Sequence, residues 1–243
     1  MAVTTEEELR GENERLRAEL ARHKQESADK ERQLERYAAD LRETFKEERA
    51  RSQELVRALC NAVEARDAYT AKHAERVTAY GVEICGAIDL DFADGHALEF
   101  GFLLHDIGKV AISDAILYKR GKLTDEERAE MARHPIIGAD IVRDIDFLSN
   151  ASKIVRSHHE RWDGSGYPDG LAGEEIPLAA RVFAVADVLD ALTSDRPYRP
   201  ASPFAVAREM IVQGSGSQFD PQVVEAFIKI PDEAFERIAR KIK

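Results

Sequence analysis

Apolar residues recur at helical spacing along most of the chain, and the pattern falls into two parts. From about residue 5 to residue 59 there is no proline and a single glycine, Gly11, while Glu, Arg, Lys, Ala and Leu dominate. When heptads are counted from Leu9, about half of the core positions are apolar and the rest are polar or charged. This pattern predicts a long helix and favours a parallel two-stranded coiled coil. The alternative is a single solvated helix that folds against its own domain.

Beyond residue 59 the helical periodicity continues, and strand-like alternation is nearly absent. From about Arg57 no helix breaker intervenes before the segment NAVEARDAYTAKHAERVTAYGVEI (61–84), so we expect the first helix to run on into the second part of the chain. Length and periodicity predict seven further helices, at about 93–105, 124–133, 135–147, 149–159, 177–193, 203–213 and 221–229.

Helix-start signals support several of these ranges. Thr124 followed by Glu127 has the pattern of a capping box. Pro135 and Pro221 suit the first position of a helix, where a proline loses no hydrogen bond. We therefore predict an all-α bundle preceded by a long N-terminal helix, with a coiled-coil segment at 1–59 and a globular domain at 60–243.

Composition narrows the classes of function. With 243 residues, 44% of them hydrophobic, the chain can bury one sizeable core beside an extended helix. Its formal net charge of -11 argues against binding a long nucleic acid. No segment approaches the ~20 apolar residues of a membrane span, and the N-terminus lacks the features of a secretory signal. Cys60 and Cys85 stand apart from any Cys-x-x-Cys motif, so we expect a cytoplasmic protein with no membrane contact.

The candidate chemistry lies in histidines and acids of the second part. Asp106 follows His105 inside the apolar segment GFLLHDIGKV, and Asp187 lies inside RVFAVADVLDAL. A buried carboxylate needs a cationic partner, because an isolated buried charge costs several kcal/mol. Imidazoles and carboxylates together suit iron, manganese or zinc, and two ions that share a carboxylate would hydrolyse a phosphoester. Five of the seven histidines adjoin acids or loop signals: His73, His105, His134, His158 and His159.

Each of these residues also has a purely structural explanation. A single histidine on an apolar helix, such as His73, is more often a core residue with a satisfied ring. The His105–Asp106 pair can be an ordinary hydrogen-bonded pair, and Asp187 and Asp190 can cap or pair within a bundle. Spacing alone therefore leaves a metal site and a structural cluster both open.

Resemblance to a known family favours the metal site. The chain resembles the HD-GYP domain, a branch of the HD phosphohydrolases that degrades cyclic di-GMP, over roughly residues 60 to 230. The fold that this resemblance implies is an HD-type helical bundle. The matching segments, long and in the family's order, are DAYTAKHAERV (67–77), HDIGKVAISDAILYKRGKLT (105–124), MARHPIIG (131–138), HHERWDGSGYPDGLAGEEIP (158–177), ARVFAVADVLDALTSDRPYR (180–199) and GSGSQFDP (214–221).

The resemblance also implies a site with two divalent ions, iron or manganese, that share the carboxylate of Asp106. Lys109 matches the family lysine that contacts the scissile phosphate or assists the leaving oxygen, so Lys109 and Asp106 are the predicted catalytic residues. The ligands implied for the first ion are His73, His105, Asp106 and Asp187. Those implied for the second ion are Asp106, His134, His158 and His159.

Substrate binding is assigned by the same resemblance. Guanidinium groups suit a phosphate or the Hoogsteen edge of guanine, and a tyrosine of the GYP loop lies near the nucleotide in the family. For this tyrosine, Tyr167, a packed loop anchor is the alternative. The predicted substrate-binding residues are Asp67, Tyr167, Arg196 and Arg199. The residues expected to fasten the loops are Trp162, Asp163, Asp190 and Asp195.

Two positions depart from the family pattern. Some members hold a third metal with a glutamate four residues before the first histidine; that position is Tyr69 here, so we expect two ions. Arg120 replaces a proline that is common in relatives, and we expect little effect.

The predicted function is metal-dependent hydrolysis of cyclic di-GMP to pGpG and onward to GMP, in a homodimer formed through the coiled coil that also contacts signalling proteins. Two alternatives remain. One is a signalling module that binds a cyclic dinucleotide with little turnover. The other is a phosphodiesterase for another cyclic dinucleotide, such as cyclic GMP-AMP.

Overall fold

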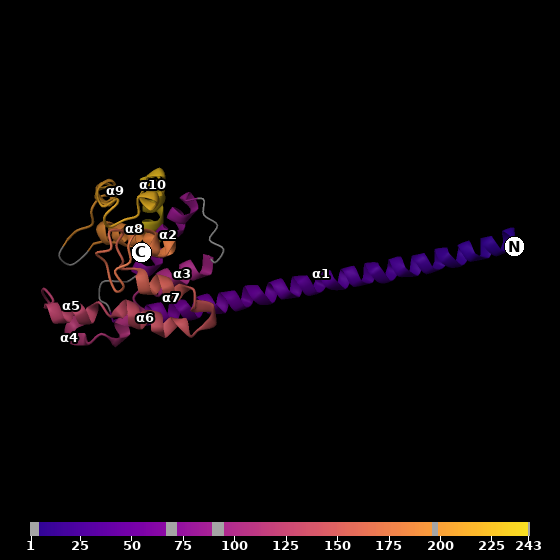
Figure 1. Ribbon diagram of the computed structural model, residues 1–243, viewed down its shortest axis with the longest axis horizontal. Helices are drawn as coiled ribbons and strands as arrows, with labels where there is room; N and C mark the ends of the chain where they lie inside the picture. The colour runs from indigo at the N-terminus through magenta and orange to yellow at the C-terminus, as the bar shows by residue number, and fades with distance from the viewer. Residues whose placement is uncertain (1–4, 67–71, 89–94, 196–198, 243) are drawn as a thin grey trace. The chain divides into compact units, whose positions relative to one another are not determined.

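A computed structural model describes residues 5–66, 72–88, 95–195 and 199–242, and Figure 1 shows the course of the chain. Helices make up the regular structure, and no β-strand occurs among the described residues, although a bridge joins Ser215 and Phe219. The predicted all-α fold with a long N-terminal helix is confirmed. The chain divides into two compact units, Met1–Gln53 and Glu54–Lys243, and each is described by itself.

The first unit is formed by most of helix α1 (Glu6–Glu64). Ion pairs along the helix, such as Arg22 Nε to Glu26 Oε1 at 2.9 Å, join residues one turn apart. The apolar heptad positions are more than half exposed, for example 55% at Leu20 and 67% at Leu34. A single helix leaves such a stripe in water, whereas a coiled coil buries it. Among the described helices, none is both long enough and apolar enough to cross a membrane.

The second unit contains the end of α1 and the remaining helices. Seven predicted ranges correspond to helices α3 and α5 to α10, with ends that differ by up to four residues. The α-helices are α2 (His73–Ala87), α3 (Gly95–Leu103), α4 (Asp114–Leu117), α5 (Asp125–Met131), α6 (His134–Arg143), α7 (Ala151–Ser157), α8 (Leu178–Thr193), α9 (Phe204–Gln213), α10 (Pro221–Lys229) and α11 (Asp232–Lys241). The 3₁₀ helices are η1 (Ile107–Ala111), η2 (Asp146–Leu148) and η3 (Gly173–Glu175).

Local signals account for where several helices begin. Thr124 accepts a hydrogen bond from the Glu127 amide while Glu127 accepts one from the Thr124 amide, so the predicted capping box at α5 is confirmed. Helix α10 begins at Pro221, as predicted, and Asp220 caps it by accepting from the amide of Gln222.

Two apolar clusters hold the second unit together. In the larger one, Val77 and Tyr80 of α2 pack with Phe183 of α8 and Phe227 of α10, all fully or almost fully buried. The smaller cluster joins the end of α1 to α3, α6 and α7; its members include Val56, Cys60, Leu104, Val142 and Val155. His105 follows Phe102 of the larger cluster and Leu104 of the smaller one in the chain.

The expectation of one helix through residues 57–84 is wrong. Helix α1 ends at Glu64, and α2 begins at His73 after Lys72, whose φ of 68° is left-handed. The end of α1 buries its apolar face in the smaller cluster, whereas Val77 and Tyr80 of α2 belong to the larger one. The break lets most of the apolar face of α2 pack into the larger cluster while Ala74, at its start, stays in the smaller one with the end of α1, a tertiary effect that overrides local periodicity.

Candidate metal centre

Helix ends bring the predicted metal ligands together. His73 and His134 are the first residues of α2 and α6, and the His158–His159 pair directly follows α7. His105 and Asp106 occupy the turn between α3 and η1, and Asp187 lies within α8. Short distances between neighbouring members connect all seven residues around one region of the second unit.

Three of the histidine rings are held in the same way. In each, Nδ1 donates to a backbone carbonyl three residues earlier in the chain. Because a carbonyl can only accept, Nδ1 carries a proton in each ring, and Nε2 carries the lone pair when the ring is in the neutral form that binds a metal. The contacts are His105 to Phe102 at 2.8 Å, His134 to Met131 at 2.8 Å and His158 to Val155 at 2.7 Å.

The Nε2 atoms of these rings lie against one another or against the Asp106 carboxylate. His134 Nε2 lies 3.2 Å from His158 Nε2 and 3.3 Å from Asp106 Oδ1. His105 Nε2 lies 3.0 Å from Asp106 Oδ2. Burial holds the pKa of His158 well below its ordinary value, so this ring is neutral. When all of these rings are neutral, their acceptors face one another and repel unless a cation lies among them, so the geometry of the donor set fits a metal ion.

His159 completes the histidine side of the cluster. Ligand atoms of His134, His158 and His159 all lie within 4.8 Å of one another. Burial lowers the pKa of His159 to about 4, which leaves a neutral ring that can bind a metal at neutral pH. Iron, manganese and zinc all accept such imidazole ligands.

Asp106 lies at the centre of the arrangement. Its Oδ2 also forms an ion pair with Lys109 Nζ at 2.8 Å. Burial by itself raises the pKa of Asp106, but the positive charges of His105, in its protonated form, and of Lys109 outweigh it and hold the pKa well below the ordinary value. The carboxylate is therefore ionised and contacts residues of both predicted ligand sets.

His73, the first residue of α2, lies between two aspartates. Its Nε2 is 3.3 Å from Asp187 Oδ1, and its Nδ1 is 2.8 Å from Asp190 Oδ2. Burial lowers the pKa of His73, but hydrogen bonds with the two carboxylates outweigh it and raise the pKa to about 10. Arg76 in turn donates from Nε to Asp190 Oδ1 at 2.6 Å. Asp190 and Arg76 thus orient the ring, a role that sequence reasoning missed because Asp190 was expected to fasten a loop.

A first prediction concerns Asp190. In Asp190→Asn the amide cannot carry the charge that holds both His73 and Arg76, so His73 loses its orientation. We expect metal affinity to fall about tenfold, the low end of the effect of removing a partner of a metal-binding histidine. Metal content after dialysis against graded free Mn²⁺ measures the change.

The matched control is Asp195→Asn, in the segment after α8, where the carboxylate accepts from the Ala201 amide at 2.9 Å. This variant is expected to keep the wild-type affinity. Equal affinity in wild type and Asp190→Asn would show that His73 needs no such partner.

A pocket of about 260 Å³ opens beside the cluster. His158, His159 and Asp187 line it together with Tyr167. The Tyr167 ring stacks on His159 with centroids 4.7 Å apart, and burial raises the pKa of Tyr167 to about 12, so its hydroxyl stays protonated. The structure thus places Tyr167 against a predicted metal ligand, at the wall of a cavity.

The loop that carries Tyr167 is fastened directly to the His159 segment. A Cβ at Gly166 would lie 2.4 Å from the backbone nitrogen of Arg161, so only glycine permits this approach. Oε1 of the buried Glu160 accepts from the amides of Asp169 and Gly170 at 2.7 and 3.1 Å. Sequence reasoning missed Glu160; its place directly after the two histidines was the available signal.

The other predicted substrate-binding residues are placed differently. Arg199 Nη2 donates to the carbonyl of Ala191 at 2.6 Å, so its guanidinium is engaged by the end of α8. Asp67 and Arg196 lie outside the described residues. Their roles, and that of Arg199, stay predictions.

The family model described as HD domain matches residues 16–223 of the chain. The chain belongs to the HD domain family. This HD domain contains the predicted His105–Asp106 pair, and the resemblance seen in the sequence is confirmed. HD domain phosphohydrolases are metal-dependent, in agreement with a histidine cluster that can hold a metal.

Among curated proteins, the HD domain is similar to a cyclic di-GMP phosphodiesterase of Vibrio cholerae, with 50% identity over 147 residues, 58% of this chain and 30% of that protein. It is 41% identical to the cyclic di-GMP phosphodiesterase response regulator RpfG of Xanthomonas campestris over 74% of this chain and 48% of that one. A 3'3'-cGAMP-specific phosphodiesterase 2 of Vibrio cholerae is 40% identical over 80% of this chain and 36% of its own length. The chain thus spans less than half the length of each of these relatives.

Solved structures support the fold. A cyclic GMP-AMP specific phosphodiesterase of Vibrio cholerae superposes with a TM-score of 0.58 at 22% identity, covering 76% of this chain and 53% of that one. An HDG"Y"P protein from Bdellovibrio bacteriovorus gives a TM-score of 0.50 at 22% identity, over 64% of this chain and 50% of that one. At this identity the likeness concerns the fold alone.

Proposed function

We propose that the chain is a metal-dependent phosphodiesterase that hydrolyses cyclic di-GMP to pGpG and onward to GMP. The observation that carries the proposal is the set of acceptor atoms of His105, Asp106, His134 and His158, which face one another at 3.0 to 3.3 Å. The names of relatives that share 41 to 50% identity supply the substrate. Because these relatives are longer proteins, the activity is assigned to this chain as a proposal.

The residues present fit two divalent ions, iron or manganese. One would be held by His73, His105, Asp106 and Asp187, and the other by Asp106, His134, His158 and His159. When bound, the ions supply Lewis-acid activation of the phosphodiester and of water.

The chain's own groups position and neutralise the substrate. The Lys109 ammonium, 2.8 Å from Asp106, lies where it can counter negative charge on a leaving oxygen. Tyr167 gives the cavity an aromatic wall for a nucleotide base, and its protonated hydroxyl can donate to a phosphate oxygen. The buried rings of His158 and Phe183 limit water on the inner side.

The experiment is chromatographic detection of products after anaerobic incubation with cyclic di-GMP and either Fe²⁺ or Mn²⁺. We expect pGpG and GMP to form, with about two ions bound per chain. Removal of metal by a chelator is expected to abolish turnover, and the metal alone is expected to restore it.

Parallel incubations with 3'3'-cGAMP test the second candidate substrate, which the cGAMP-specific relative favours. Turnover of cGAMP but not of cyclic di-GMP would move the assignment to that substrate. Binding of either dinucleotide without turnover, in the fully metal-loaded protein, would make the chain a signalling module.

We also propose that residues 1–59 form a parallel coiled-coil dimer and that residues 60–243 form the HD-GYP domain. The exposed heptad leucines of α1, such as Leu20 and Leu34, support the dimer because pairing would remove them from water. A signalling protein partner remains part of the proposal.

A further inference from the structure

Among the described residues, the one directly before α2 does not cap the start of the helix with its side chain. Helix α2 begins at His73, a proposed metal ligand, and the amides of its first turn need acceptors. The preceding residue, Lys72, has a left-handed backbone, and within the described residues its side chain makes no capping hydrogen bond. The position of His73 depends on what holds this helix end.

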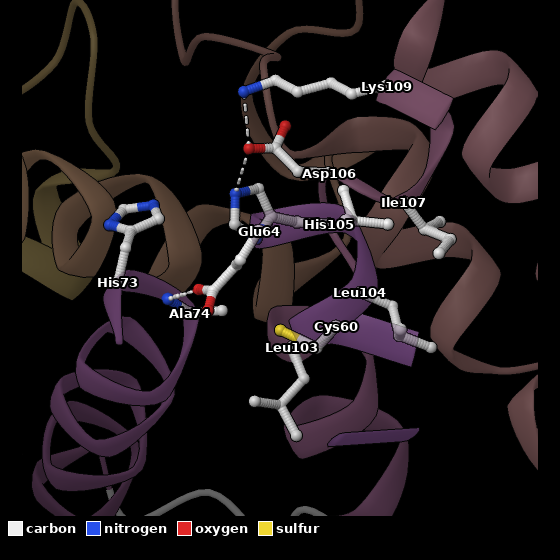
Figure 2. A pocket seen from close by; sticks show the side chains of 11 residues that line it. Cys60, Glu64, His73, Ala74, Leu103, Leu104, His105, Asp106, Ile107 and Lys109 are labelled. Atoms are coloured by element: carbon white, nitrogen blue, oxygen red, sulfur yellow. Dashed lines mark hydrogen bonds and ion pairs between the residues drawn. The ribbon is translucent and has the colours of Figure 1, made fainter. Parts of the chain in front are cut away.

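Glu64, the last residue of α1, supplies the acceptor. Its Oε1 accepts from the backbone amide of Ala74, the second residue of α2, at 3.2 Å, as Figure 2 shows. A carboxylate at this place satisfies an open amide and opposes the positive end of the helix dipole. Glu64 therefore acts as the cap of α2, although it lies nine residues earlier than His73 in the chain.

The last turns of α1 are themselves firmly placed. Val56 is fully buried and Cys60 is 5% exposed in the cluster that also contains Leu103 and Leu104, next to His105. Glu64 and Cys60 line one small pocket, of about 20 Å³, with His73, Asp106 and Lys109 (Figure 2). The end of α1, the start of α2 and the His105–Asp106 turn thus enclose one space, and Glu64 bridges two of its walls.

We propose that Glu64 is a positioning residue for the metal centre, through which the end of α1 fixes His73. Asp190 orients the His73 ring through Nδ1, and Glu64 fixes the backbone that carries the ring. The inference rests on the proposed function because it concerns the affinity of the ion that His73 would hold.

The test is a titration of the full metal-free chain with Mn²⁺ alone, in which electron paramagnetic resonance measures the free ion. In Glu64→Ala we expect one of the two ions to bind about tenfold more weakly, as for loss of a partner that orients a metal-binding histidine. Glu64→Gln keeps a carbonyl acceptor for the Ala74 amide and is expected to stay within about twofold of wild type.

The matched control is Glu83→Ala, which removes an exposed glutamate from the same helix, α2, and is expected to bind both ions as wild type does. Circular dichroism of the metal-free variants verifies that each is folded before the titration.

Three outcomes would overturn the inference. Wild-type affinity in Glu64→Ala would show that the cap does not position His73. An equal loss in Glu64→Gln and Glu64→Ala would assign the effect to the negative charge rather than to the hydrogen bond. If wild type itself binds no Mn²⁺, the proposed metal centre fails and the inference fails with it. In the first two outcomes wild type still binds Mn²⁺, so the failure of the metal centre can be told apart from the failure of the inference alone.

Discussion

Asp106→Asn is expected to abolish turnover of cyclic di-GMP. The carboxylate lies 3.0 Å from His105 Nε2, 3.3 Å from His134 Nε2 and 2.8 Å from Lys109 Nζ, so it touches both proposed ligand sets and the proposed catalytic lysine. An asparagine has the same shape, but its amide group replaces one acceptor oxygen with a donor and removes the charge. We expect a loss in kcat of about 10³-fold or more, as for removal of a central electrostatic element of an active site.

Product chromatography measures the turnover, and metal analysis is expected to find that the variant binds fewer ions than wild type. The matched control is Asp144→Asn, because the Asp144 side chain is 83% exposed beside Arg143 and should not affect turnover. A thermal melt separates loss of chemistry from loss of folding. Turnover close to wild type in Asp106→Asn would remove Asp106 from the centre of the mechanism.

Much of the fold could be predicted because helix signals in this chain are local. The stretch without breakers predicted α1, and the Pro221 start signal located α10. The break between α1 and α2 could not be predicted, since its cause is tertiary. The capping acceptor for α2 comes from Glu64, and Val77, Tyr80 and Ile84 of α2 pack into a different cluster from the end of α1.

In the candidate site, too, some residues could be predicted from the sequence and others could not. The predicted metal ligands stand in long, ordered motifs, and the structure brings all seven together. The roles of Asp190, Arg76 and Glu64 were missed because a sequence does not reveal which side chains will meet in the fold. Asp190 contacts the His73 ring, Arg76 contacts Asp190, and Glu64 contacts the Ala74 amide. For Arg199, the residue type suggested a role that its contacts do not display: its guanidinium is suited to a phosphate, but it donates to the Ala191 carbonyl at the end of α8.

Gly108→Ala is expected to disrupt the metal centre without changing any ligand. A Cβ at Gly108 would lie 2.0 Å from the carbonyl oxygen of His134 and 2.6 Å from the backbone nitrogen of Gly138. Because both neighbours are backbone atoms of α6, η1 must move away from α6, and Asp106 must move away from His134 with it. Overpacking of this kind costs about 1–3 kcal/mol of stability, and a shift of about 1 Å at a reactive site can cost about 10²-fold in rate.

Gly86→Ala is the matched control, because no described atom lies within 4 Å of a Cβ at Gly86 in α2. This variant is expected to gain up to about 1 kcal/mol, since alanine favours a helix over glycine. Gly108 is not among the positive-φ glycines of the described chain, so its substitution tests whether a Cβ fits between η1 and α6 rather than whether the backbone conformation allows a side chain. Thermal unfolding, bound Mn²⁺ and turnover are measured for both variants. If Gly108→Ala kept wild-type metal content and rate, the close approach of η1 to α6 would not be what holds Asp106 beside His134.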